Sequence, residues 1–205
     1  MASVTAHTTL SWNRIEAFGA ELALVSDAPG LRALGWALGA APIAYSCHYT
    51  LQTDDQWRTV ALDVQTEGAG WSRSLRLARR PGSSGWRVRA GETGELAAPA
   101  PGAEYPEAFE DALDIDLGYS PLTNTLPIRR LGLLDEAPGT EHEITVAWVE
   151  VPSLAVIANV QRYTPLGDGR FVYRSADYRA EITVDPAGYV VHYPGLATAE
   201  KRADT

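Results

Sequence analysis

The sequence WSRSLRLAR at residues 71–79 alternates apolar and polar side chains, and WRVR at residues 86–89 follows after the turn-forming stretch PGSSG. In an extended chain, Trp71, Leu75 and Leu77 lie on one face, which is the pattern of a half-buried β-strand. Gly, Pro and Ser between two such segments favour a chain reversal. These residues therefore predict an antiparallel hairpin.

The same pattern continues on both sides of this hairpin. Upstream, residues 57–64 alternate, with Val60, Leu62 and Val64 on one side. Downstream, turn residues separate five further segments rich in β-branched and aromatic residues, at 144–151, 156–163, 169–174, 180–184 and 189–193. Short strands at regular spacing, without long amphipathic helices, predict an all-β sandwich or barrel with few short helices. One helical turn is expected within residues 105–113.

The chain has 205 residues, a length that can bury one sizeable core. We expect a single domain over residues 1–205. Two rounds of strands, each ending in a turn and an aromatic strand, suggest two similar halves at 1–100 and 101–205. Residues 91–106, rich in Ala, Pro, Gly and Glu, are predicted as the surface loop or linker between these halves.

Composition excludes several classes of protein. The net charge of -9 disfavours nucleic-acid binding, which uses clustered basic side chains. The longest weakly polar stretch, residues 31–51, contains Arg32, Pro42 and His48, so no integral membrane association is expected. The first ten residues lack the parts of a secretory signal, and Cys47 is the single cysteine, so we expect a cytoplasmic protein.

No metal or cofactor site is predicted. The stretch that begins His142-Glu143 lacks the second histidine of a zinc helix. Residues 114–118 lack the third oxygen ligand of a calcium loop and place its glycine one position early. Cys47 and His48 are neighbours, and on a strand they point to opposite faces, so a packed thiol is expected rather than a catalytic pair.

The least generic segment is LDIDLGYSPLTNTLPIRRL at residues 113–131. If it is extended, Asp114 and Asp116 share a face, and Arg129 and Arg130 fall on opposite faces. A guanidinium matches a carboxylate in a bidentate way, so one arginine is expected to pair with an aspartate while the other stays open to a ligand. An equally open interpretation is that the whole segment is buried and joins the two halves through polar contacts, because buried charges need partners.

This segment, together with Ala147-Trp148, VQRY at 160–163, GYVV at 188–191 and Tyr193-Pro194-Gly195, resembles the bacterial "putative glycolipid-binding" family. The resemblance extends from Trp12 to Gly195. It implies a large antiparallel sheet curled into a barrel-like shell, similar to the lipoprotein carriers LolA and LolB, with no established catalytic residues. Asp111-Ala112 stand where family members commonly have Gly-Cys, so no thiol is given a role there.

We therefore expect non-enzymatic binding of a glycolipid or another amphiphile in the concave face of the sheet. The six Trp and nine Tyr supply rings that have an apolar body and a polar edge. Arg129 and Arg130 are candidates for the headgroup, Asn124 for hydrogen bonding, and Asp114 and Asp116 for orienting the arginines. The resemblance places the remaining candidates in the same sheet: Trp148, Gln161, Tyr163 and Tyr193.

Two other functions stay open at this stage. A hydrolase acting on a lipid or sugar ester could use Asp114 and Asp116 as an acid and base pair, with His192 nearby. A sheet module could bind a protein partner through an exposed edge. No catalytic residue is assigned, and the oligomeric state is not predicted.

Overall fold

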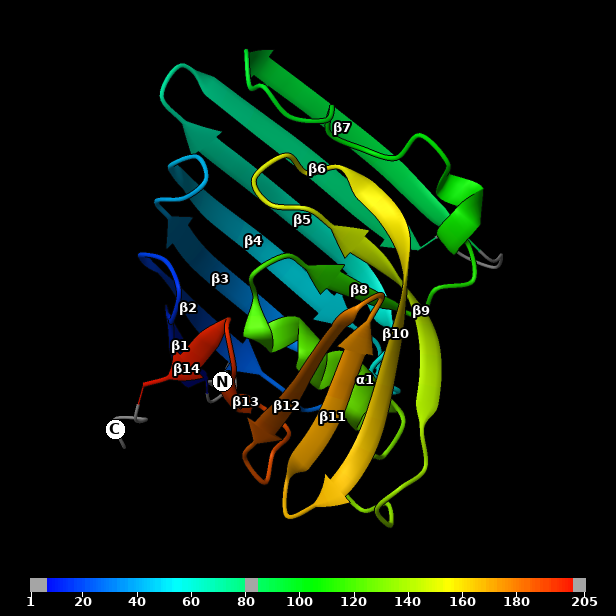
Figure 1. Ribbon diagram of the computed structural model, residues 1–205. Helices are drawn as coiled ribbons and strands as arrows, with labels where there is room; N and C mark the ends of the chain where they lie inside the picture. Colours follow the sequence, from blue (N-terminus) through cyan, green and yellow to red (C-terminus); the bar gives the residue numbers. More distant parts are fainter. Residues whose placement is uncertain (1–6, 80–84, 201–205) are drawn as a thin grey trace, which may run out of the picture.

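The computed structural model describes residues 7–79 and 85–200, which form one 14-stranded sheet (Figure 1). Residues 81–84 of the turn predicted at 81–85 lie outside the described residues. Seven consecutive strands form the first meander, with each strand paired to the next: β1 (Thr8–Arg14), β2 (Gly19–Ser26), β3 (Arg32–Gly39), β4 (Tyr45–Thr53), β5 (Thr59–Gly68), β6 (Trp71–Arg79) and β7 (Trp86–Gly94). The predicted pairing of residues 71–79 with 86–89 is confirmed.

The second half begins with one strand and three short helices: η1 (Pro106–Phe109), β8 (Asp114–Leu117), η2 (Pro121–Asn124) and α1 (Thr125–Arg130). A second meander follows: β9 (His142–Val149), β10 (Val156–Gly167), β11 (Arg170–Ser175), β12 (Tyr178–Val184), β13 (Val190–Tyr193) and β14 (Ala197–Ala199). Strand β14 pairs with β1, which joins the two meanders into one sheet. The helical turn expected within residues 105–113 is present as η1.

The predicted large, curled sheet is confirmed, with two differences from the prediction. The sheet is curled but does not close, because β7 and β8 stand at opposite ends of the strand order. The sheet is also not wholly antiparallel, since β8 runs parallel to β9. Strand β8 is four residues long, and the Ile115 backbone N–H donates to Thr59 Oγ1 of β5 (3.3 Å). The edge strand of the second half therefore docks against β5 of the first meander.

Alternating side chains account for the core. Along β4, Tyr45, Cys47, Tyr49 and Leu51 point inward and are buried, whereas His48 is exposed. Burial raises the pKa of the Cys47 thiol to about 12, so it is a packed, protonated thiol, as predicted.

Hydrogen bonds between residues distant in sequence stabilise the curled shape of the sheet. The Trp12 indole N–H donates to the carbonyl of Val190 (2.7 Å), and the Thr66 hydroxyl donates to the carbonyl of Pro152 (2.8 Å). Arg73 is buried on β6 and donates to the carbonyl of Ser153 (2.9 Å). These bonds satisfy buried carbonyls of the second half with donors from the first.

The segment 113–131 is extended only at its start. Strand β8 is as predicted, but residues 121–130 form η2 and α1, so the prediction of continuous extension is wrong. Pro121 and Pro127 lie in the first turns of these helices, where a backbone N–H has no partner within the helix, so proline is tolerated there. Figure 1 shows α1 within the concave side of the curled sheet. Among the described residues, no helix is long and apolar enough to cross a membrane.

Candidate functional site

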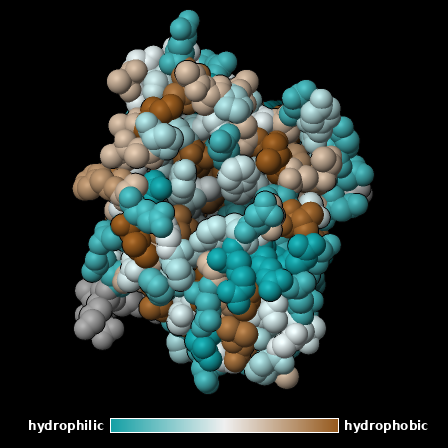
Figure 2. Space-filling view, in the orientation of Figure 1, coloured by the Kyte–Doolittle hydropathy of each residue, from teal (hydrophilic) through white to brown (hydrophobic). Residues whose placement is uncertain are grey.

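A cavity of about 450 Å³ opens where three turns from distant parts of the sequence meet. Its wall combines the loop after β8, the facing ends of β9 and β10, and the β11–β12 and β13–β14 turns. Five aromatic side chains line it: Tyr119, Trp148, Tyr173, Tyr178 and Tyr193. On the face shown in Figure 2, hydrophobic residues form separate patches among hydrophilic ones.

The loop after β8 is held in an unusual conformation at the cavity wall. Tyr119 has a φ of 67°, in the left-handed region that side chains other than glycine rarely adopt. The Gly118 N–H donates to the carbonyl of Val149 (2.8 Å), and the Arg14 guanidinium lies 4.0 Å from the Tyr119 ring centre. Such local strain concentrates at functional sites, and here it fixes an aromatic ring at the wall.

A cluster of tyrosines forms another part of the wall. Tyr173 packs edge-on against Tyr178 and Tyr193, with ring centres 6.2 and 5.8 Å apart. Burial raises the pKa of Tyr173 and Tyr193 above the ordinary phenol value, so both hydroxyls stay protonated and can donate hydrogen bonds. Beside them, the Ser175 hydroxyl donates to Asn159 Oδ1 (2.8 Å).

At the cavity wall and behind it, four of the predicted residues form one chain of hydrogen bonds. Asn124 Nδ2 donates to the Tyr163 hydroxyl (2.9 Å), which donates to Gln161 Oε1 (3.2 Å). Gln161 Nε2 then donates to Asp116 Oδ2 (2.6 Å), and Thr123 donates to the other oxygen of Asp116 (2.8 Å). Burial raises the pKa of Asp116 even though these hydrogen bonds favour its charged form.

The structure thus brings six of the nine predicted site residues together. Asp116, Asn124, Trp148 and Tyr193 line the cavity, and Gln161 and Tyr163 lie directly behind it.

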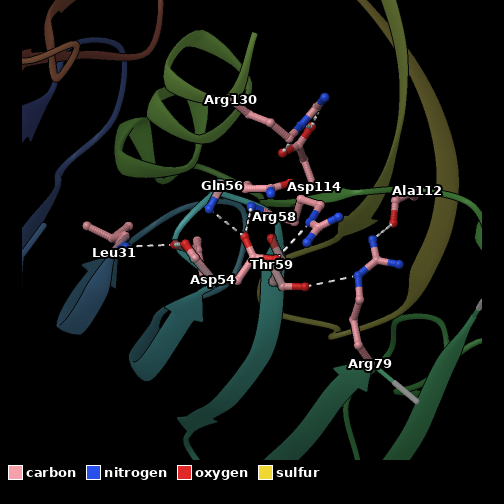
Figure 3. Close-up of polar contacts among 10 residues, drawn as sticks. Leu31, Asp54, Gln56, Arg58, Thr59, Arg79, Ala112, Asp114 and Arg130 are labelled. Carbon is pink, nitrogen blue, oxygen red and sulfur yellow. Dashed lines mark hydrogen bonds and ion pairs between the residues drawn. The ribbon is translucent and has the colours of Figure 1, made fainter. Parts of the chain in front are cut away.

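The other three predicted residues, Asp114, Arg129 and Arg130, do not line the cavity. Arg130 forms an ion pair with Asp114, with Nη2 at 2.6 Å from Oδ2, and the two side chains are 13% and 1% exposed. Figure 3 shows this pair next to the polar contacts of Arg58 and Arg79. One arginine therefore pairs with an aspartate, as expected.

Arg129 makes its contacts outside the cavity. Its Nη1 donates to the carbonyl of Ala187 (2.7 Å), and its guanidinium lies 4.4 Å from the Trp57 ring centre. The prediction that the second arginine faces a pocket depended on extended backbone, and the helix α1 directs its side chain elsewhere.

Sequence reasoning missed Tyr119, Glu150, Asn159, Ser175 and Tyr178 at the cavity wall. Asn159 could have been found, because it shares a face with Gln161 and Tyr163 in the period-two pattern of β10. Tyr119 and Tyr178 lie at turns, where periodicity gives no direction. Of the described residues that line the cavity, none is Lys, Arg or His.

A second buried acid lies behind the cavity wall. Glu21 on β2 accepts hydrogen bonds from the Tyr49 hydroxyl and from Ser120 Oγ (2.7 Å), and Ser120 itself lines the cavity. Glu21 Oε2 has no hydrogen-bond partner among the described residues. Burial raises the pKa of Glu21 to about 7. Within the described chain, no group of three His, Cys, Asp or Glu side chains could hold a metal ion.

The comparisons with known proteins agree with this architecture. The model of the family described as "Putative glycolipid-binding" matches residues 9–199. A crystal structure of a DUF1089 family protein from Pseudomonas aeruginosa is 30% identical in sequence, with a TM-score of 0.65, and the match covers 82% of this chain and 85% of that one. No curated protein sequence matches the chain. Because the family model spans nearly the whole sequence, the chain belongs to the "putative glycolipid-binding" family.

Proposed function

We propose that the cavity binds the uncharged sugar headgroup of a glycolipid without chemical conversion. The observation that carries this proposal is the lining itself, in which five aromatic rings alternate with hydroxyl, amide and carboxylate groups and no cation is present among the described lining residues. Aromatic faces pack against the C–H faces of sugars, and amides and carboxylates bind their hydroxyl groups. The volume of about 450 Å³ is within the usual range for small-ligand sites.

The charges favour a neutral headgroup over an anionic one. Asp116 and Glu150 face the cavity, whereas Arg129 and Arg130 are engaged elsewhere. We propose that Asp116, Asn124 and Asn159 take the headgroup role that the sequence suggested for the arginines. A hydrolase that uses Asp114 with Asp116 has no support, because Asp114 is buried against Arg130 and does not line the cavity.

Calorimetric titration with n-octyl β-D-glucoside, kept at monomeric concentrations, tests the proposal. Asn159→Ala removes one amide at the cavity wall, and we expect its Kd to rise about fivefold to tenfold, the effect of one lost hydrogen bond. Gln65→Ala is the matched control, since it removes an exposed amide on β5, outside the cavity. Equal affinity in wild type and Asn159→Ala, or no binding heat in wild type, would contradict the proposal.

A further inference from the structure

The face of the first meander opposite the core carries an unexpected run of apolar side chains. On β2 and β3, Leu22, Leu34, Trp36 and Leu38 are 42, 39, 43 and 42% exposed. The strand register makes them neighbours, because Leu22 pairs with Trp36, Ala20 with Leu38 and Leu24 with Leu34. We call this set the outer strip: Ala20, Leu22, Leu24, Leu34, Trp36 and Leu38.

Polar, largely uncharged side chains border the outer strip along its length. Ser11 and Asn13 of β1 lie on one side, and Ser46 and His48 of β4 lie on the other. At one end, Leu22, Trp36 and Leu38 form part of a groove of about 450 Å³. The described residues that line this groove include two acids, the exposed Glu67 and the buried Glu21, and no Lys or Arg.

We propose that the outer strip is a second binding site, for a single alkyl chain of an uncharged amphiphile. The strip is two strands wide and spans residues 20–24, roughly 14 Å along the strand direction, so it has the dimensions of one extended chain. An apolar floor with a few polar groups at its rim is the usual lining of such a site. The site is separate from the cavity, because the sheet stands between them.

The alternative occupants fit the strip less well. Four half-exposed side chains present on the order of 400 Å², about half of the roughly 800 Å² per partner that a stable protein interface buries. An anionic lipid surface attracts patches bordered by several Lys or Arg side chains. The described lining of this groove has neither, and Arg32, which precedes Leu34 on the same face of β3, is a single cation at the other end of the strip. A single uncharged alkyl chain needs neither a large interface nor a cationic border.

Tryptophan fluorescence separates this site from the cavity. Trp36 lies on the outer strip and Trp148 lines the cavity, whereas Trp12, Trp57, Trp71 and Trp86 are 2, 8, 8 and 3% exposed. In a Trp148→Phe chain, 8-bromooctan-1-ol should quench Trp36 with a saturating concentration dependence, because bromine quenches indole on contact. Leu22→Thr should raise the Kd about threefold to fivefold through lost apolar contact, and Leu22→Val should restore most of the affinity. Val160→Thr, a change at a 42% exposed valine of β10, is the matched control and should leave the Kd unchanged.

Non-saturating quenching of Trp36, or an unchanged Kd in Leu22→Thr, would overturn the outer strip as a site. Saturable quenching in a Trp36→Phe chain, where Trp148 is the reporter, without saturable quenching in the Trp148→Phe chain would also overturn it. This result would place the alkyl chain in the cavity. Saturable quenching of Trp36 in a chain that shows no heat with octyl glucoside would support the outer strip while contradicting the sugar cavity, so the two proposals fail separately.

Discussion

At the scale of single residues, Glu21 is an acid buried without a cationic partner. Tyr49 and Ser120 both donate to the same carboxylate oxygen, and the other oxygen has no partner among the described residues. Tyr45, Cys47 and Arg14 line the same small internal space beside it. Burial favours the neutral acid and raises the pKa of Glu21 from 4.5 to about 7.

This raised pKa predicts that stability falls as pH rises. Between pH 4.5 and about 7 the folded chain holds a proton that the unfolded chain has lost, so the free energy of unfolding decreases across this window, by on the order of 3 kcal/mol for Glu21. Glu21→Gln keeps an oxygen acceptor for Tyr49 and Ser120 and cannot ionise. In urea unfolding at pH 5, 6, 7 and 8, the free energy of unfolding of the variant should increase relative to that of wild type as pH rises. If the free energies of unfolding of the two proteins changed in parallel with pH, Glu21 would not titrate in this range.

The ion pair of Arg130 with Asp114 predicts a large asymmetry between two arginines. Arg130→Met leaves a buried carboxylate without its partner and should lower the free energy of unfolding by about 3 kcal/mol. Arg58→Met breaks the pair with Asp54, whose side chains are 44% and 27% exposed, and should cost less than about 1 kcal/mol. Chemical denaturation of both variants and of wild type measures these two losses. Equal losses would mean that burial does not set the strength of these pairs.

At the scale of elements, the strands and the helical turn η1 were predictable, and the helices η2 and α1 were not. Alternation identified β5, β6 and β7 because one face of each strand meets the core. The helices η2 and α1 are four and six residues long, too short for helical periodicity to show, and their prolines suggested extended backbone. The directions of Arg129 and Arg130 could therefore not be predicted from the sequence.

Close packing between β3 and β4 gives a prediction at this scale. A Cβ at Gly35 would lie 2.1 Å from the Tyr49 ring, which reaches across β3 to Glu21. Gly35→Ala should therefore lower the free energy of unfolding by about 2 kcal/mol and the Tm by several degrees. Gly91→Ala on β7, where the nearest atom would be the Ser74 hydroxyl at 3.2 Å, is the control and should change the Tm little. A Tm loss at Gly91 as large as that at Gly35 would contradict this explanation.

At the scale of the whole molecule, the cavity depends on how the two meanders meet. Its wall takes residues from the loop after β8 and from turns that are tens of positions away in sequence. The all-β class was predictable from periodicity, and the curled sheet followed from the family resemblance. The parallel β8–β9 pair and the open sheet were not predictable, because strand order depends on contacts such as Thr66 with Pro152 that leave no local pattern.

The most direct test of the sugar-binding cavity is a nitrogen-15 NMR titration of the full chain with n-octyl β-D-glucoside. Binding in the cavity predicts saturating shifts, with one common Kd, at the backbone amides of Tyr119, Asn159, Ser175 and Gly195, which come from four separate parts of the sequence. The absence of shifts at these four amides, at concentrations where other amides of the chain respond, would contradict a sugar site in this cavity.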